Sequence, residues 1–293
     1  MPCWARVLPR PLESQPSYGA SLGDASYWGP WVREVLSRHA LVGGEPVAGF
    51  VGSFPVFLCG DVVVKLFASA FDGHACWAVE LACREAPLSP AVLASGTFYE
   101  DGDWPYVVFE RVAGVAWRDL SSSLSPSAKH EVAAQLGEAV RAVHSLPAPA
   151  FRTTLLAELR ATAASRAKLP PHLLAQVDDY LRDALPATHF VHGDITEDHV
   201  YIDRSALVAI IDWGDALLAD PYYELCAVFS GTFAGDLALF RTFLDAYAWP
   251  VDDAFPKRML QAMLSFQFNA FYGMSLPDVA TLDELAAALF ARL

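Results

Sequence analysis

The chain reads HGDITEDHVYI at residues 192–202 and VAIIDWG at residues 208–214. Asp212 directly follows Ile210-Ile211, and Asp194 follows Phe190-Val191 after the two residues His192-Gly193, so each acid lies at the exit of a predicted strand. Such strand ends normally exclude acids, because an unpaired buried carboxylate is costly. We therefore expect two adjacent hairpin strands that bring Asp194, His199 and Asp212 together. Two carboxylates and a third ligand suit a hard cation that holds a polyphosphate.

The chain upstream of this stretch has a β-rich pattern. Glycines punctuate β-branched and aromatic runs, and Gly60-Asp61 between two such runs predicts a hairpin. Apolar residues at helical spacing flank these runs. We predict helices over 27–40 and 74–86, extended structure over 46–67, and strands over 91–98 and 105–112.

Downstream of Gly114 the apolar spacing becomes mainly helical. We predict helices over 127–145, 153–168 and 171–185, and broken helices over 222–293. The last of these begins at Thr281, with Glu284 three residues on, which is a capping-box pattern. Three short extended segments, at 189–192, 199–203 and 207–212, interrupt the helices.

Composition excludes several protein classes. Hydrophobic residues make up 54% of the 293 residues and charged residues 18%, whereas disorder requires low apolar content. The formal net charge is −14, with 20 Lys and Arg against 34 Asp and Glu, so we expect no nucleic-acid partner. This acidic balance either favours a cationic ligand or only keeps the protein in solution.

We expect a cytoplasmic protein with no membrane partner. The five cysteines are odd in number and form no C-x-x-C pair, so neither a disulfide framework nor a zinc ribbon is predicted. No apolar run approaches the roughly 18 residues that a membrane span requires.

The pattern as a whole resembles the aminoglycoside phosphotransferase family, relatives of the protein kinases. His192-Gly193-Asp194 is similar to the family's catalytic loop, and Ile211-Asp212-Trp213-Gly214 to its metal-binding segment. VVVK at 62–65 resembles the strand that carries a phosphate-contacting lysine, YVVFE at 106–110 the hinge that meets adenine, and ADPYYEL at 219–225 the segment after the metal-binding acid. The resemblance implies an α+β, bilobal, protein-kinase-like fold. Its β-rich N-lobe would span 1–111, and its larger helical C-lobe 112–293 with the catalytic hairpin and the acceptor site.

The resemblance also implies roles for single residues in phosphoryl transfer, which depends on positioning and charge neutralisation. Asp194 would orient the acceptor hydroxyl or take its proton, and Asp212 would hold Mg²⁺ against the phosphates of ATP or GTP. Lys65 would contact those phosphates. Because it follows three valines it needs a buried partner, with Glu80 our first choice and Glu85 our second. The remaining predicted nucleotide contacts are Ser53 in a glycine-rich loop, and Glu110 and Val112 at the hinge.

One position departs from the family pattern. His199 stands where the family has an asparagine that offers Mg²⁺ an oxygen. An imidazole offers nitrogen, which suits softer metals. Either His199 is a second metal ligand beside Asp212, or it contacts phosphate, or the site uses one metal only.

The predicted acceptor is a small cationic molecule, most closely an aminoglycoside such as hygromycin B, because Tyr18–Leu22 and Tyr27-Trp28 resemble phosphotransferases that modify its 7″ hydroxyl. Glu197, Asp215 and Glu224 are the predicted amine-binding acids; exposed acid–amine pairs are weak singly, so several must converge.

Three alternatives stay open at this point. The acceptor is another antibiotic, a sugar or an amino alcohol. A metal-dependent hydrolase uses His192, Asp194, His199 and Asp212 as ligands. Or the protein binds nucleotide without turnover.

Overall fold

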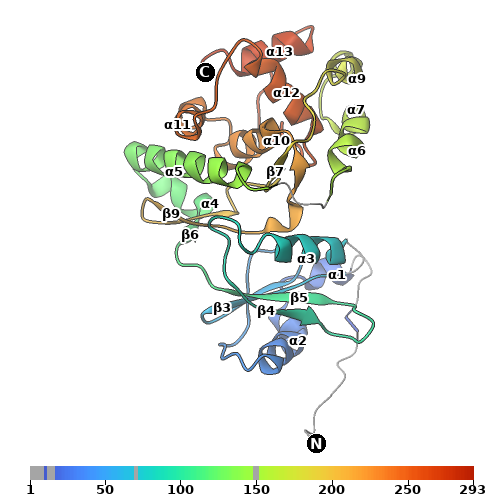
Figure 1. Ribbon diagram of the computed structural model, residues 1–293, viewed down its shortest axis with the longest axis vertical. Coiled ribbons are helices and arrows are strands. Elements are labelled where there is room, and N and C mark those ends of the chain that lie inside the picture. The colour runs from blue at the N-terminus through green and yellow to red at the C-terminus, as the bar shows by residue number, and fades with distance from the viewer. Residues whose placement is uncertain (1–9, 12–16, 69–71, 148–151) are drawn as a thin grey trace, which may run out of the picture. The chain divides into compact units, whose positions relative to one another are not determined.

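The computed structural model describes residues 10–11, 17–68, 72–147 and 152–293 (Figure 1). The chain divides into two compact units: an N-terminal unit of Met1–Arg84 and Pro90–Val112, and a C-terminal unit of Glu85–Ser89 and Ala113–Leu293. Residues 1–9 and 12–16, the start of the predicted N-lobe, lie outside the described ranges. No helix within those ranges has the length and low polarity needed to cross a bilayer.

The N-terminal unit is built on an antiparallel five-stranded sheet of order β1-β2-β3-β5-β4. Its strands are β1 (Val47–Ala48), β2 (Val56–Cys59), β3 (Val62–Leu66), β4 (Val92–Thr97) and β5 (Pro105–Glu110). Its helices are α1 (Ser17–Ser21), α2 (Ala25–Arg38) and α3 (Gly73–Ala82). β2 and β3 form the hairpin predicted at Gly60-Asp61, where Gly60 has a φ of +67°. The paired register sets Lys65 opposite Val56.

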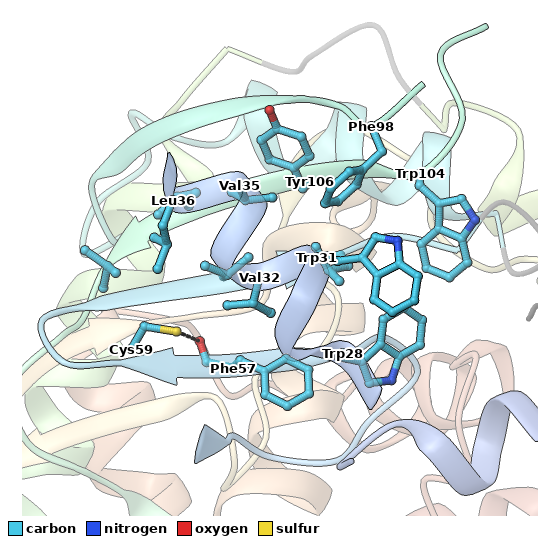
Figure 2. Close-up of a cluster of buried hydrophobic side chains, with 14 of the residues drawn as sticks. Trp28, Trp31, Val32, Val35, Leu36, Phe57, Cys59, Phe98, Trp104 and Tyr106 are labelled. Atoms are coloured by element: carbon cyan, nitrogen blue, oxygen red, sulfur yellow. Dashed lines mark hydrogen bonds between the residues drawn. The ribbon is translucent and has the colours of Figure 1, made fainter. Parts of the chain in front are cut away.

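Helix α2 supplies the core of this unit. Asp24 caps its N-terminus by accepting hydrogen bonds from the backbone N–H groups of Ser26 and Tyr27. Its apolar face, which includes Trp28 and Trp31, packs against side chains of β2 and β5 (Figure 2). The buried residues of this cluster on the sheet side include Phe57, Cys59, Val64, Leu66, Tyr106 and Val108.

The C-terminal unit is mainly helical. Its helices are α4 (Trp117–Leu120), η2 (Ser121–Ser123), α5 (Pro126–His144), α6 (Leu155–Ala161), α7 (Ala163–Arg166), α8 (Pro171–Leu174), α9 (Val177–Tyr180), η3 (Trp213–Asp215), α10 (Pro221–Cys226), η4 (Ala227–Thr232), α11 (Leu237–Tyr247), α12 (Phe255–Ser265) and α13 (Leu282–Leu289). Thr281 and Glu284 form the predicted capping box at the start of α13.

Two small antiparallel sheets lie in the C-terminal unit. One has the order β6-β8-β9, from β6 (Val115–Ala116), β8 (Val200–Asp203) and β9 (Ala206–Ile210). The other pairs β7 (His189–Val191) with β10 (Leu217–Ala219). The two sheets deliver the ends of β7, β8 and β9 to the loops that carry Asp194, His199 and Asp212.

The predicted α+β class, with a β-rich part followed by a helical part, is confirmed. The two continuous helices predicted over 153–168 and 171–185 are wrong, because each is broken into two short helices. The Thr162 hydroxyl donates to the carbonyls of Glu158 and Leu159 at the first break, a local bond that competes with the helix. At the second, Gln176 bonds to Ala280 and to the first turn of α13, a tertiary demand that sequence spacing does not show.

Candidate active site

The loop after β7 carries Asp194, and its backbone is hydrogen-bonded to a buried acid, Glu224. Both carboxylate oxygens of Glu224 on α10 accept hydrogen bonds, from the backbone N–H of His192 at 2.5 Å and from that of Gly193 at 3.2 Å. The Glu224 side chain is fully buried, where bonds to a charged acceptor are strong. Gly193 has a φ of +85°, and a Cβ there would lie 2.7 Å from the carbonyl oxygen of Asp215, so only glycine makes this turn without displacing its neighbour.

His192 ties this loop to the segment that precedes Asp212. The backbone N–H of Asp194 donates to His192 Nδ1 at 3.2 Å, which leaves the hydrogen of the neutral ring on Nε2. Nε2 then donates to the carbonyl of Ile211 at 3.0 Å. Full burial lowers the pKa of His192, which favours the neutral ring that this arrangement needs. His192 is therefore a structural link, as the burial of its ring against Trp213 also indicates.

Asp194 and Asp212 lie on either side of the His199 ring. His199 Nδ1 is 3.4 Å from an oxygen of Asp194, and His199 Nε2 is 3.7 Å from an oxygen of Asp212. His199 and Asp212 stand at the same end of the β8–β9 hairpin, which the bond from Ile211 N–H to the His199 carbonyl closes. The predicted convergence is thus present. The predicted hairpin accounts only for His199 and Asp212, because Asp194 follows β7, whose partner is β10.

The environment of Asp194 disfavours its charge. Burial raises the pKa of this carboxyl to about 7; the nearby carboxylates of Asp215, Asp212 and Glu224 act in the same direction, while His199 opposes them. A carboxyl group with a pKa near neutrality can both take up and return a proton. This is the property that an acceptor hydroxyl would require of its proton acceptor.

The residues present fit a divalent cation at Asp212. His199 Nδ1 lies 2.7 Å from the carbonyl oxygen of Asp194, which can only accept, so Nδ1 carries a hydrogen, and Nε2 carries the lone pair when the ring is neutral. That lone pair and the Asp212 carboxylate, which is 40% exposed, form a nitrogen–oxygen donor pair. A cation bound by one or two protein groups completes its shell with water and substrate phosphates. Within the described ranges no group of three or more His, Cys, Asp and Glu side chains is arranged to hold a metal by itself.

In the N-terminal unit, Lys65 forms the ion pair that we predicted with Glu80. Lys65 Nζ donates to a Glu80 oxygen at 2.7 Å, and the two side chains are 7% and 3% exposed. The ammonium also lies 5.1 Å from the ring centre of Phe67, on the strand's continuation. Lys65 comes from β3 and Glu80 from α3, so the pair fixes the helix against the sheet. Their role towards a nucleotide stays a prediction.

The other predicted nucleotide contacts lie in the same unit. Ser53 is exposed, and its carbonyl accepts a hydrogen bond from the Tyr18 hydroxyl at 2.9 Å. Glu110 ends β5 with an exposed side chain, and its backbone N–H donates to the carbonyl of Ala91 at 2.9 Å. Val112 is the last residue of the unit. Nothing in these positions tests whether they meet a nucleotide.

The predicted amine-binding acids have different surroundings. The prediction that Glu224 binds the acceptor is wrong. Its carboxylate is fully buried, and both of its oxygens accept hydrogen bonds from the loop backbone. Glu197 lies 3.2 Å from Arg118, and Asp215 lies 3.7 Å from Arg152. These two acids stay predicted acceptor contacts, each with an arginine beside it.

The structural role of Glu224 was missed by sequence reasoning. Glu224 is 31 residues from Gly193, and no local pattern connects a helical glutamate to a loop that far away. The neighbouring sequence contained a usable signal. The five residues that follow Glu224, LCAVF at 225–229, are all apolar or aromatic. An acid in such a context is buried and needs partners.

A family model described as the phosphotransferase enzyme family matches residues 60–259. Among curated proteins, a lysine-specific demethylase, JMJ21 of Arabidopsis thaliana, is 21% identical over a match that covers 50% of this chain and 22% of the relative. The chain therefore spans about a fifth of the length of that relative.

Solved structures share the fold at low identity. The GDP complex of aminoglycoside 2′-phosphotransferase-IIIa has a TM-score of 0.61 at 18% identity and covers 89% of this chain and 90% of its own. A thermostable mutant of aminoglycoside phosphotransferase APH(4)-Ia, in ternary complex with ADP and hygromycin B, has a TM-score of 0.57 at 18% identity, with 88% and 91% covered. The macrolide 2′-phosphotransferase MphH from Brachybacterium faecium has a TM-score of 0.57 at 18% identity, with 90% and 98% covered.

The family model covers more than half of the chain, including the Lys65 strand and both aspartates of the site, and the solved structures have the same kinase-like fold. The chain belongs to the phosphotransferase enzyme family.

Proposed function

We propose that this protein is a small-molecule kinase that transfers the terminal phosphoryl group of ATP or GTP to a hydroxyl group of a small acceptor. The observation that carries this proposal is the convergence of Asp194 and Asp212 on His199, at 3.4 and 3.7 Å. In phosphoryl transfer the protein mainly positions reactants and neutralises charge. Asp194 orients the hydroxyl and receives its proton.

The nucleotide role rests on residues of each unit. Lys65, held by Glu80, contacts the phosphates as a point charge. Asp212 holds Mg²⁺ or a related cation with His199, and that cation supplies charge neutralisation for the phosphates. Solved structures of this fold include complexes with GDP, ADP and ATP, which supports nucleotide binding and leaves the choice between ATP and GTP open.

The first candidate acceptor is an aminoglycoside such as hygromycin B, so that the activity would confer resistance. Solved structures of this fold include complexes with kanamycin, hygromycin B and streptomycin. Glu197 and Asp215 are the acids that would meet its amines. The second candidate is an acceptor of lower charge. It is favoured by Arg118 and Arg152 beside those acids and by the macrolide phosphotransferase among the structures of this fold.

The hydrolase alternative has less support. It requires His192 as a metal ligand, but both ring nitrogens of His192 are engaged with backbone groups of Asp194 and Ile211. It also gives no purpose to the buried Lys65–Glu80 pair.

A resistance screen tests the proposal. The chain is expressed in a sensitive bacterium, which is challenged with hygromycin B, kanamycin, streptomycin and a macrolide, with the Asp194→Ala variant as the control. We expect protection against at least one antibiotic and its loss in the variant. The purified protein should transfer phosphate from ATP or GTP to the same compound. Protection that survives the substitution would mean sequestration, and nucleotide hydrolysis without transfer to any of them would contradict the proposed acceptors.

A further inference from the structure

Helix α10 and the π-helix η4 run on without a break from Pro221 to Thr232, and they contact the catalytic loop twice. The first contact is Glu224, beneath His192 and Gly193. The second lies on the other side of Asp194. There the Thr232 hydroxyl donates to the carbonyl of Ile195 at 2.8 Å. One continuous helical segment therefore holds the backbone both before and after the catalytic aspartate.

The second contact is a close one. The carbonyl of Gly231 accepts a hydrogen bond from the backbone N–H of Glu197 at 3.3 Å. A Cβ on Gly231 would lie 2.7 Å from Cγ2 of Thr196 and 3.3 Å from its Cα, so the helix backbone lies directly against the loop. Thr232 is 2% exposed, and the bond between its hydroxyl and Ile195 is buried. Water cannot replace this bond, and its loss would leave a buried carbonyl without that donor.

The π-helical turn explains how one helix reaches both sides of Asp194. In an ideal α-helix, residues eight positions apart, such as Glu224 and Thr232, point about 80° away from each other. The bond from Phe233 N–H to the Val228 carbonyl spans five residues, as in a π-helix, and the wider turn reduces that angle. Such turns are rare and occur frequently at functional sites.

We propose that the π-helical turn of Ala227–Thr232 is a positioning element for phosphoryl transfer, in which Thr232 and Gly231 fix the loop that carries Asp194. The claim that this turn affects turnover rests on the proposed function. The claim that it holds the Asp194 loop in place does not. Thr232 and Gly231 act only through the loop backbone and touch no reactant.

The hydroxyl of Thr232 is tested with a matched set of variants. Thr232→Val removes the hydroxyl at nearly constant volume, and Thr232→Ser keeps it. Ser230→Ala removes a neighbouring hydroxyl that donates to Cys226 within the same helix, so it is the control. Hydrogen exchange is measured by mass spectrometry on the segment 192–199 and, for global unfolding, on the segment 282–289. We expect faster exchange at 192–199 alone in Thr232→Val, and wild-type exchange in Thr232→Ser and Ser230→Ala.

Turnover then separates positioning from stability. With GTP or ATP, and kanamycin or hygromycin B as the probe acceptor, Thr232→Val should lower kcat by roughly tenfold or more, since a displacement of about 1 Å can cost 10²-fold. Its KM for nucleotide should stay within a factor of about two, and Thr232→Ser should restore kcat. Unchanged exchange at 192–199 in Thr232→Val overturns the proposal. A wild-type enzyme that phosphorylates no acceptor overturns the proposed function instead, and the exchange result still decides whether η4 holds the loop.

Gly231 offers a test by compensation. Gly231→Ala pushes its new methyl group against Cγ2 of Thr196, and Thr196→Ser removes that methyl group while keeping the hydroxyl. We expect faster exchange at 192–199 in Gly231→Ala, and partial recovery in the double variant Gly231→Ala/Thr196→Ser relative to Gly231→Ala alone, with Thr196→Ser as the control. If the double variant exchanges as fast as Gly231→Ala, the contact between Gly231 and Thr196 is not what holds the loop.

Discussion

The two charged clusters of this protein differ in how their charges are balanced. In the N-terminal unit, Lys65 and Glu80 are an ion pair of opposite charge at 2.7 Å, almost fully removed from water. In the C-terminal unit, two carboxylates, Asp194 and Asp212, flank one imidazole at 3.4 and 3.7 Å, and Asp212 is 40% exposed. In the first cluster the two opposite charges balance each other. The second carries an excess of negative charge, which a bound cation would balance.

Because of this difference, we expect the two clusters to respond differently when a charged group is removed. A buried ion pair loses most when one partner is removed, because the remaining charge has no compensation. In the second cluster, burial first and then the neighbouring carboxylates raise the pKa of Asp194 to about 7, so this carboxyl is close to its protonation midpoint near neutral pH. Four substitutions separate the two behaviours.

The largest effect is expected at Asp194, the proposed catalytic carboxylate. Asp194→Asn removes the proton acceptor and should lower kcat by about 10³-fold, since a positioned general base contributes about 10²–10⁴-fold. The variant should unfold at a urea concentration no lower than the wild type, because the lost carboxylate is one that burial disfavours. Asp203→Asn, at the exposed end of β8, is the control. Steady-state kinetics with saturating nucleotide measure the effect, and a variant that retains a tenth of wild-type kcat would remove Asp194 from its assigned role.

The ion pair should show the reverse pattern, in which stability changes first. Glu80→Gln removes the carboxylate that pairs with the buried Lys65 ammonium at 2.7 Å and should lower the free energy of unfolding by about 3 kcal/mol. The double variant Lys65→Met/Glu80→Leu should regain most of this stability, because an apolar pair fills the space. It should still show no turnover and weak nucleotide binding. Urea unfolding and nucleotide titration measure these effects. Full turnover in the double variant would contradict the role of Lys65.

Glu224 lies beneath the second cluster and touches no reactant. Glu224→Gln replaces one accepting oxygen by an NH₂ group that opposes a backbone N–H, so the loop should shift and kcat fall by about 10²-fold. The KM for nucleotide should change little, as expected of a positioning residue. Glu138→Gln, an exposed change on α5, is the control. Equal kcat values for both variants would show that the loop keeps its geometry without this carboxylate.

The smallest effect is expected at His199. Because an imidazole nitrogen suits Mn²⁺ better than Mg²⁺, His199→Asn should lower the ratio of kcat with Mn²⁺ to kcat with Mg²⁺ by roughly threefold. Chelated protein reloaded with each metal is assayed at several concentrations. Identical metal profiles in the two proteins would show that His199 is not a ligand.

Much of the candidate site was predictable because its signals are local. The apolar runs that end in Asp194 and Asp212, the turn at Gly60-Asp61 and the capping box at Thr281 each depend on residues a few positions apart. Lys65 could be assigned a buried partner from its apolar neighbours alone. Glu80, on the following helix, was the first choice and Glu85 the second, and only the fold shows that Glu80 pairs with Lys65.

The features that could not be predicted depend on contacts between distant segments. From the sequence alone Glu224 was predicted to bind amines, but its hydrogen bonds to a loop 31 residues away make it a support for the backbone of that loop. The breaks at Thr162 and Gln176 arise where side chains bond to backbone carbonyls or to α13. The π-helical turn at 227–232 has no signature in residue types, because its extra residue is accommodated by packing against the loop.

The sequence by itself therefore determined which residues are candidates for the chemistry and which strands and turns present them, because these choices follow from apolar periodicity, turn chemistry and the cost of burying charge. Tertiary structure alone decided which acid meets the loop, which meets the lysine and which faces solvent. The physical reason is that a carboxylate's role is set by what surrounds it: the same group is a backbone anchor at Glu224, an ion-pair partner at Glu80 and, with a raised pKa, the proposed proton acceptor at Asp194.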